Sequence, residues 1–246
     1  MDRVYHAVPK GYVAPMIYSL NELEKHRPEL YKEIAPNEKK DSWVAPGVHI
    51  NDVINTSTIN PAILRREMRA AGWSEGDEED ESDRMYSGRV TRLTRFFAIP
   101  FASLLSYAKR NSQRVFLWKQ SVDPTTVSMW SKDDEGRTCV NPDLITEIKD
   151  ATQYAEETSP QAMTAAYYRL WTYARRRGFD FMWMVQKLKS DGGALSDEDM
   201  SVPELAREEW LNTPMVAFCG VDHVLITGSL DMSAIDGVEE IDIASE

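Results

Sequence analysis

The feature that most constrains this chain is the separation of its charges along the sequence. Residues 84–119 hold eight basic residues and no Asp or Glu, whereas residues 74–83, directly before them, hold seven acidic residues in ten. Residues 191–246 hold fourteen acidic residues and one basic residue, and the whole chain has a net charge of −12. The segment after residue 190 therefore accounts for all of the excess negative charge, and we predict a cationic region beside an acidic C-terminal segment.

The basic stretch has the spacing of an amphipathic helix. At about 100° per residue, its large apolar residues between positions 86 and 97 fall on one narrow stripe, and its arginines fall on a neighbouring arc that includes Phe96. Pro100 is expected to end this helix, because proline disfavours helical geometry in the residue before it. A second helix is predicted over residues 101–110. Its inward-facing residues are expected to be Leu104, Leu105 and Ala108.

The function expected of this cationic region is contact with nucleic acid. Arginine presents a planar fork of donors that suits phosphate oxygens, and an aromatic ring can stack on an unpaired base. The alternative is a solvated helix flank whose arginines pair with residues 74–83 or with another subunit. Three further arginines precede Gly178 at the end of a predicted helix, where the alternative is a favourable interaction with the negative helix end. The candidate nucleic-acid-binding residues are Arg84, Arg89, Arg92, Arg95, Phe96, Lys109, Arg110, Arg114, Arg175, Arg176 and Arg177.

Capping residues, prolines and turns divide the rest of the chain into short elements. A capping residue followed by proline, or by glutamate three residues later, predicts helix starts at Ser19, Asn60, Asn141 and Ser159. The helix after Asn141 is expected to run to about residue 157. Two β-hairpins are predicted from the β-rich residues 114–119 with 125–130, and 215–219 with 221–227. We therefore predict a mainly α, or α+β, fold with a helical core of about eight helices and two short β-hairpins.

The same signals divide the chain into three regions. These are an N-terminal arm over residues 1–18, a helical core over residues 19–190 with an acidic loop at 74–83, and an acidic C-terminal segment over residues 191–246. Gly192 and Gly193 mark the last boundary. The residues from 230 onward are expected to form an acidic tail, whose spaced Ile and Val can dock as a strand.

Motifs for catalysis, metal binding and cofactor binding are not found. The chain has no Gly-rich phosphate loop and no Gly-x-Ser-x-Gly nucleophile elbow, and its four histidines are scattered. Cys219 and His223 are too few for a zinc site. We therefore expect no enzyme activity, no catalytic residue, no metal and no cofactor.

The two cysteines and the lack of long apolar runs bear on the compartment. Cys139 and Cys219 are expected to be free thiols, because no secretion signal precedes them. No run of about 18 apolar residues is present, so no membrane span is expected. The expected location is the cytoplasm, or a host cytoplasm or virion if the protein is viral.

Residues 178–181, Gly-Phe-Asp-Phe, resemble a short sequence in the coat proteins of flexible filamentous plant viruses. The resemblance covers only these four residues, and neither the acidic C-terminal segment nor the arginines match that pattern. No family is assigned from it.

Two functions follow from the separation of charge. The first is a non-enzymatic assembly or structural protein, of the kind found in viruses and phages, that contacts the nucleic-acid backbone through cationic helices. The second is an acidic protein-interaction or regulatory module that binds a basic partner protein without nucleic acid. The expected partners are therefore nucleic acid, a second copy of the chain or another protein.

Overall fold

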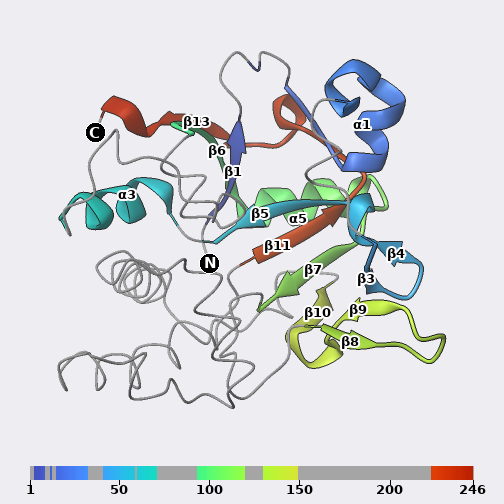
Figure 1. The fold of residues 1–246 in the computed structure, drawn as a ribbon. Helices are drawn as coiled ribbons and strands as arrows, with labels where there is room; N and C mark the ends of the chain where they lie inside the picture. The colour runs from blue at the N-terminus through green and yellow to red at the C-terminus, as the bar shows by residue number, and fades with distance from the viewer. Residues whose placement is uncertain are drawn as a thin grey trace, which may run out of the picture.

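The computed structural model describes residues 3–8, 12, 15–32, 41–58, 60–70, 93–119, 130–148 and 223–245. Among these residues, thirteen strands form three sheets, accompanied by the α-helices α1 (Leu20–His26), α3 (Pro61–Ala70) and α5 (Phe101–Arg110) (Figure 1). The described fold is mostly β. The prediction of a mainly α, or α+β, fold with a helical core and two short hairpins is therefore wrong.

The main sheet has seven strands, and every neighbouring pair is antiparallel. In spatial order they are β10 (Ile145–Ile148), β7 (Val115–Trp118), β11 (His223–Thr227), β5 (Val53–Ser57), β1 (Arg3–Val8), β6 (Arg95–Pro100) and β13 (Glu239–Asp242). The residues expected to form an N-terminal arm thus supply β1, which lies between β5 and β6 inside the sheet.

Both faces of the main sheet are covered at its centre. All four residues of β7 are buried, and a strand that is buried on both sides reads as a continuous apolar run rather than as an alternating one. One face packs against α5, which Figure 1 shows behind β5 and β11. The sheet residues in this core include Val4, Ile54, Ile99, Val115, Leu117, Val224 and Ile226.

The opposite face packs against a smaller, four-stranded sheet. Its strands are, in order, β4 (Val48–His49), β3 (Trp43–Ala45), β9 (Thr138–Val140) and β8 (Trp130–Lys132). Val44 and Val140 from this sheet meet Phe116, Trp118 and Leu225 from the main sheet. A third sheet pairs β2 (Met16–Tyr18) with β12 (Ser229–Asp231).

The helix starts that the sequence predicts at Ser19 and Asn60 are confirmed. The Ser19 hydroxyl accepts a hydrogen bond from the Glu22 amide at 3.4 Å, and the Asn60 side chain accepts one from the Ala62 amide at 3.0 Å. The helix predicted over residues 101–110 is confirmed as α5, and its three inward residues are buried. These predictions rest on local hydrogen bonds and spacing, which act in the same way in any tertiary fold.

The helix predicted through Phe97 to Pro100 is wrong, because residues 95–100 form strand β6. All six residues of β6 pair with β1, so both strands satisfy their backbone hydrogen bonds in the sheet. Alternate residues of a strand share a face. Phe97 is therefore the ring that lies on the same face as Arg95, whereas Phe96 points to the other face.

The helix predicted after Asn141 is wrong over the residues that the structure describes. The Asn141 side chain does cap a turn, accepting a hydrogen bond from the Asp143 amide at 3.1 Å. That turn is the single 3₁₀ turn η2 (Pro142–Leu144), and the chain then continues as β10, paired with β7. A cap marks where a helix can begin but does not set its length.

The two predicted hairpins are only partly within the described residues. Residues 115–118 and 223–227 are strands, as expected, but β7 and β11 pair with each other. Of the residues expected to pair with them, 125–129 and 215–219 lie outside the described ranges, whereas Trp130 belongs to β8 and pairs with Val140 of β9.

The C-terminal residues belong to the core of the protein. Leu230, Met232, Ile235 and Ile243 are all buried, and β13 extends the main sheet. The 3₁₀ turns η4 (Met232–Ala234) and η5 (Ile243–Ser245) follow β12 and β13. The expectation that this segment can dock as a strand is confirmed, and removing it would remove part of the core.

None of the helices that the structure describes is long and apolar enough to cross a lipid bilayer.

We expect Leu230→Ala to lower the free energy of unfolding by about 2–5 kcal/mol, because it leaves a cavity at a fully buried position. Urea denaturation followed by circular dichroism measures this change. Met232→Leu is the control, and it should cost less than about 1.5 kcal/mol because the side-chain volume is nearly conserved. A Leu230→Ala protein as stable as the parent would show that this segment is not part of the core.

Candidate functional site

The acidic edge of the main sheet is formed by β13, the last strand beside β6 among the described residues (Figure 1). Its sequence is Glu-Glu-Ile-Asp, and its three carboxylate side chains are exposed. Glu240 and Asp242 lie on the face of Phe97 and Arg95, and Glu239 lies on the opposite face. We define the acidic edge as Glu239, Glu240 and Asp242.

Two arginines of the neighbouring strands hold the acidic edge. Arg3 of β1 reaches across β6 to the Glu239 carboxylate at 2.8 Å. On the other face, the Arg95 Nε atom donates to Glu240 at 2.6 Å, and a second nitrogen of the same guanidinium also contacts this carboxylate. The side chains of Glu239 and Glu240 are 61% and 45% exposed, against 32% and 28% for their arginines. The carboxylates are therefore the outer charges and the guanidinium groups the inner ones.

Asp242 ends β13 and caps the turn that follows it. Its carboxylate accepts a hydrogen bond from the Ala244 amide at 3.0 Å. This bond is the largest cause that lowers the pKa of Asp242, and the Thr94 side chain, Arg95 and Arg65 lower it further. The charged form of Asp242 is therefore stabilised by folding.

The structure places two predicted nucleic-acid-binding residues on β6, facing opposite sides of the sheet. Arg95 points to the Glu240 side and is bound to that carboxylate. Phe96 is fully buried on the other side. Its ring therefore lies inside the core, away from any ligand at the surface.

Three other predicted residues lie at the ends of α5 and β7. Lys109 and Arg110 are exposed in the last turn of α5, where positive charge offsets the negative helix end. Arg114 donates to both oxygens of Glu147 at 2.8 and 2.7 Å, and its guanidinium lies over the Phe116 ring. In this bidentate pair, Glu147 occupies the two guanidinium nitrogens with which Arg114 would bind a phosphate.

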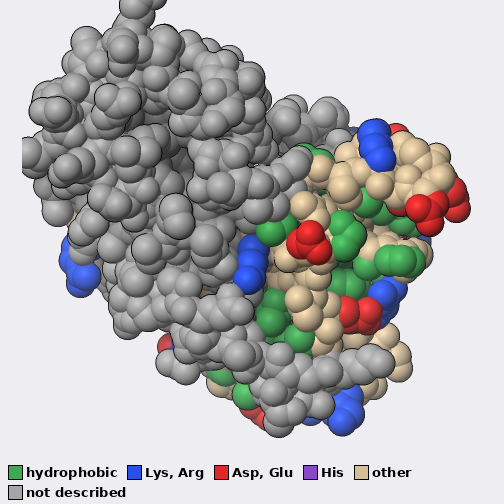
Figure 2. Space-filling model, turned by 90° about the horizontal axis from the view of Figure 1, so that it is seen from below, with side chains coloured by type: hydrophobic (Ala, Val, Ile, Leu, Met, Phe, Trp, Pro, Cys, Tyr) green, Lys and Arg blue, Asp and Glu red, His purple; other side chains and the backbone are tan. Residues whose placement is uncertain are grey.

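The remaining predicted residues lie outside the described ranges. They are Arg84, Arg89, Arg92, Arg175, Arg176 and Arg177. The structure therefore brings together no cationic face from the described members of the predicted set. On the side drawn in Figure 2, acidic and basic side chains of the described surface are interspersed with hydrophobic ones.

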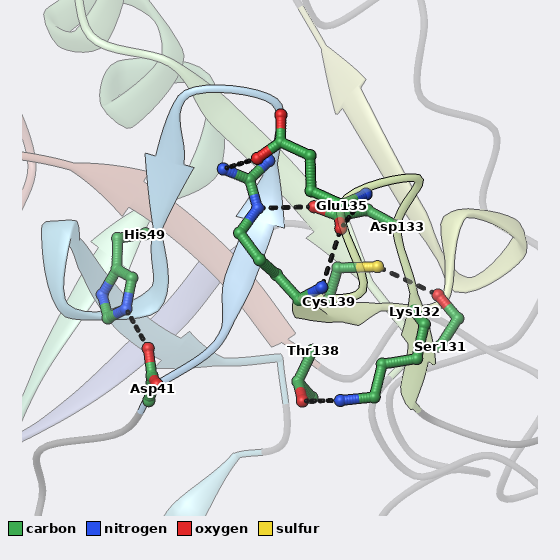
Figure 3. A network of polar contacts seen from close by, with 9 residues as sticks. Asp41, His49, Ser131, Lys132, Asp133, Glu135, Thr138 and Cys139 are labelled. Atoms are coloured by element: carbon green, nitrogen blue, oxygen red, sulfur yellow. Dashed lines mark hydrogen bonds and ion pairs between the residues drawn. The ribbon is translucent and has the colours of Figure 1, made fainter.

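A second polar network surrounds the β8–β9 hairpin (Figure 3). Arg137 binds Asp133 and Glu135 at 2.8 Å each and lies over the Trp43 ring. The side-chain hydrogen bond from Arg137 to Asp133 lowers the pKa of Asp133 and raises the pKa of Arg137. The Asp133 carboxylate also accepts the backbone amides that close the turn, so this network stabilises the hairpin.

The other members of this network do not form a reactive or metal-binding centre. Cys139 is a free thiol 3.0 Å from the Ser131 hydroxyl, and His49 lies 3.7 Å from Asp41. Within the described residues, no three His, Cys, Asp or Glu side chains are grouped so that they could hold a metal ion.

A row of polar and aromatic side chains also crosses the middle of the main sheet. Tyr5, Ser57, His223 and Trp118 occupy directly paired positions on four neighbouring strands. Trp118 and Ser57 are almost fully buried, and the Trp118 and His223 rings are 6.1 Å apart. Tyr5 is also buried and His223 is half-buried, so this row offers little exposed surface to another protein.

Sequence reasoning missed Arg3 and did not single out the carboxylates of the acidic edge. The alternation of residues 238–243, with Val, Ile and Ile between acids, was the available signal for a strand with charged side chains. Nothing in the sequence indicates that Arg3 lies beside Glu239, because 235 residues separate them and only the sheet brings them together.

The comparisons with known proteins give no relative. No protein-family model, no curated protein and no solved structure matches the chain.

We expect Asp242→Asn to reduce stability more at pH 7 than at pH 3. The pKa of Asp242 is lower in the folded chain than in the unfolded chain, so the charged carboxylate stabilises the fold. This stabilisation is complete above the unfolded-state pKa of about 4, and it is lost as the pH falls through the folded-state pKa. Urea unfolding at both pH values measures the difference. Asp143→Asn, at an exposed site, is the control. An equal effect of Asp242→Asn at the two pH values would contradict the charge-based account.

Proposed function

We propose that this chain is a non-enzymatic protein-interaction module whose acidic edge binds a basic segment of a partner protein. The observation that carries the proposal is the arrangement of charge at β13, where the carboxylates lie outermost with the arginines behind them. A partner that approaches this edge meets carboxylates first.

The ion pairs within the chain leave these carboxylates able to take another partner. An exposed salt bridge contributes only about 0–1 kcal/mol, because solvent screens it and both side chains lose freedom. Each Glu oxygen has further lone pairs, so a lysine or arginine of a partner can be added without first removing Arg3 or Arg95. The net charge of −12 also attracts a basic partner over longer distances.

The other expected function, assembly with nucleic acid through cationic helices, has less support from the described residues. Arg95 and Arg114 are each bound to a carboxylate, and Phe96 is buried. The net negative charge also opposes the approach of a polyanion. That function rests on the exposed Lys109 and Arg110 and on residues 84–92 and 175–177, and it stays a prediction.

We assign the module to the cytoplasm, whether of the cell that encodes it or of a host. The free Cys139 thiol supports this assignment, because a reducing compartment keeps thiols free.

We expect the double variant Glu239→Gln, Glu240→Gln to bind a twelve-residue oligolysine peptide roughly 2- to 30-fold more weakly than the parent. This range follows from two exposed charge pairs. Fluorescence anisotropy at 50 and 300 mM salt measures the affinity, and the loss should be larger at low salt.

The control is the double variant Glu24→Gln, Glu29→Gln, which removes the same charge from exposed sites in α1 and in the helical residues 28–32. It should bind like the parent. Equal weakening by both double variants would mean that only net charge matters. A parent that ignores the peptide but binds a 20-nucleotide single strand would instead favour the nucleic-acid function.

A further inference from the structure

The backbone of β13 alternates between bonds to β6 and groups that point away from it. The Ile243 amide donates to the Thr94 carbonyl at 2.8 Å, which makes these two residues a hydrogen-bonded antiparallel pair. Hydrogen-bonded and non-hydrogen-bonded pairs alternate along an antiparallel ladder. Ile241 and Glu239 therefore bond to β6, whereas the amides and carbonyls of Glu240 and Asp242 point outward.

The outward groups have the spacing of a strand template. Glu240 and Asp242 are two residues apart, which is about 7 Å along a strand. The 3₁₀ turn η5 begins at Ile243, so its first i→i+3 hydrogen bond ends on the Asp242 carbonyl. The groups left for a partner strand are the Glu240 amide and carbonyl and the Asp242 amide, so Glu240 presents one donor and one acceptor and Asp242 presents one donor. An extended segment laid beside β13 can take up these three groups as the eighth strand of the sheet.

The side chains of β13 decide which segment can be added. A second copy of β13 would place carboxylates opposite carboxylates, which destabilises a strand pair. A segment with lysine or arginine at alternate positions would place its bases opposite Glu240 and Asp242, on the face where Arg95 balances one of the two charges. The acidic edge thus disfavours self-pairing and favours a basic strand.

We propose that β13 binds its partner by strand addition, and that the partner contributes an extended segment with basic residues at every second position. This inference rests on the proposed function and specifies its mode. Backbone hydrogen bonds position the added segment beside β13, and its alternating basic residues make the binding selective for a basic partner.

The test uses an eight-residue peptide that alternates Lys and Val, together with two N-methylated forms. One form is methylated at every Lys and the other at every Val, so the two have the same charge and number of methyl groups. In an antiparallel pair the backbone of the Lys residues meets Glu240 and Asp242, and in a parallel pair the backbone of the Val residues does. Strand addition therefore predicts that one form binds at least about tenfold more weakly while the other keeps its affinity.

A protein variant tests the same contact from the other side. Glu240→Pro removes the outward amide, and edge positions of a sheet tolerate proline. Glu240→Gln removes the charge and keeps the amide. We expect Glu240→Pro to bind the peptide about 2- to 10-fold more weakly than Glu240→Gln, with thermal melting used to verify that both variants fold.

The outcomes separate strand addition from the proposed function. If both methylated forms bind like the parent peptide, or lose affinity equally, strand addition is overturned while binding of a basic partner stands. The same holds if a block peptide of four Lys and four Val binds as well as the alternating one. If neither peptide nor oligolysine binds, the proposed function fails and strand addition fails with it.

Discussion

The rest of the structure depends on burial of both faces of the main sheet. Four strands at its centre come from distant parts of the chain, and their apolar side chains are covered by α5 on one face and by the smaller sheet on the other. The segments that cover the sheet therefore have to fold back over β7 and β11, as residues 43–49 and 138–144 do. This requirement explains why short, locally ambiguous segments become strands.

At the β13 edge of the main sheet, neither layer covers the backbone, and unwanted strand pairing has to be prevented in another way. An exposed edge strand is a template for unwanted pairing, and natural proteins protect such edges with charge. Here the protection consists of exposed carboxylates held in place by Arg3 and Arg95 from behind. The same carboxylates disfavour pairing of β13 with a second copy of itself, and they are the charges to which we propose that a basic partner binds.

The sequence predicted local features better than their assembly. Ser19, Asn60 and the helix at 101–110 were predicted from caps and spacing, because these depend on residues within one or two turns. The helix through Phe97 was not borne out. Several apolar residues within a window of about twelve can fit a helical stripe, and the deciding factor was the partner strand β1, which lies about ninety residues earlier.

What the sequence alone determined is where charge is concentrated, where helices can begin, and that the residues after 230 can form a strand. Only the tertiary structure decided that Arg95 meets Glu240, that Phe96 is buried while Phe97 lies beside Arg95, and that the outward backbone groups of β13 belong to Glu240 and Asp242. The physical reason is the range of the interactions. Capping and periodicity act over a few residues, whereas sheet register is set by pairing between strands that lie up to 215 residues apart, as Met16 of β2 and Asp231 of β12 do.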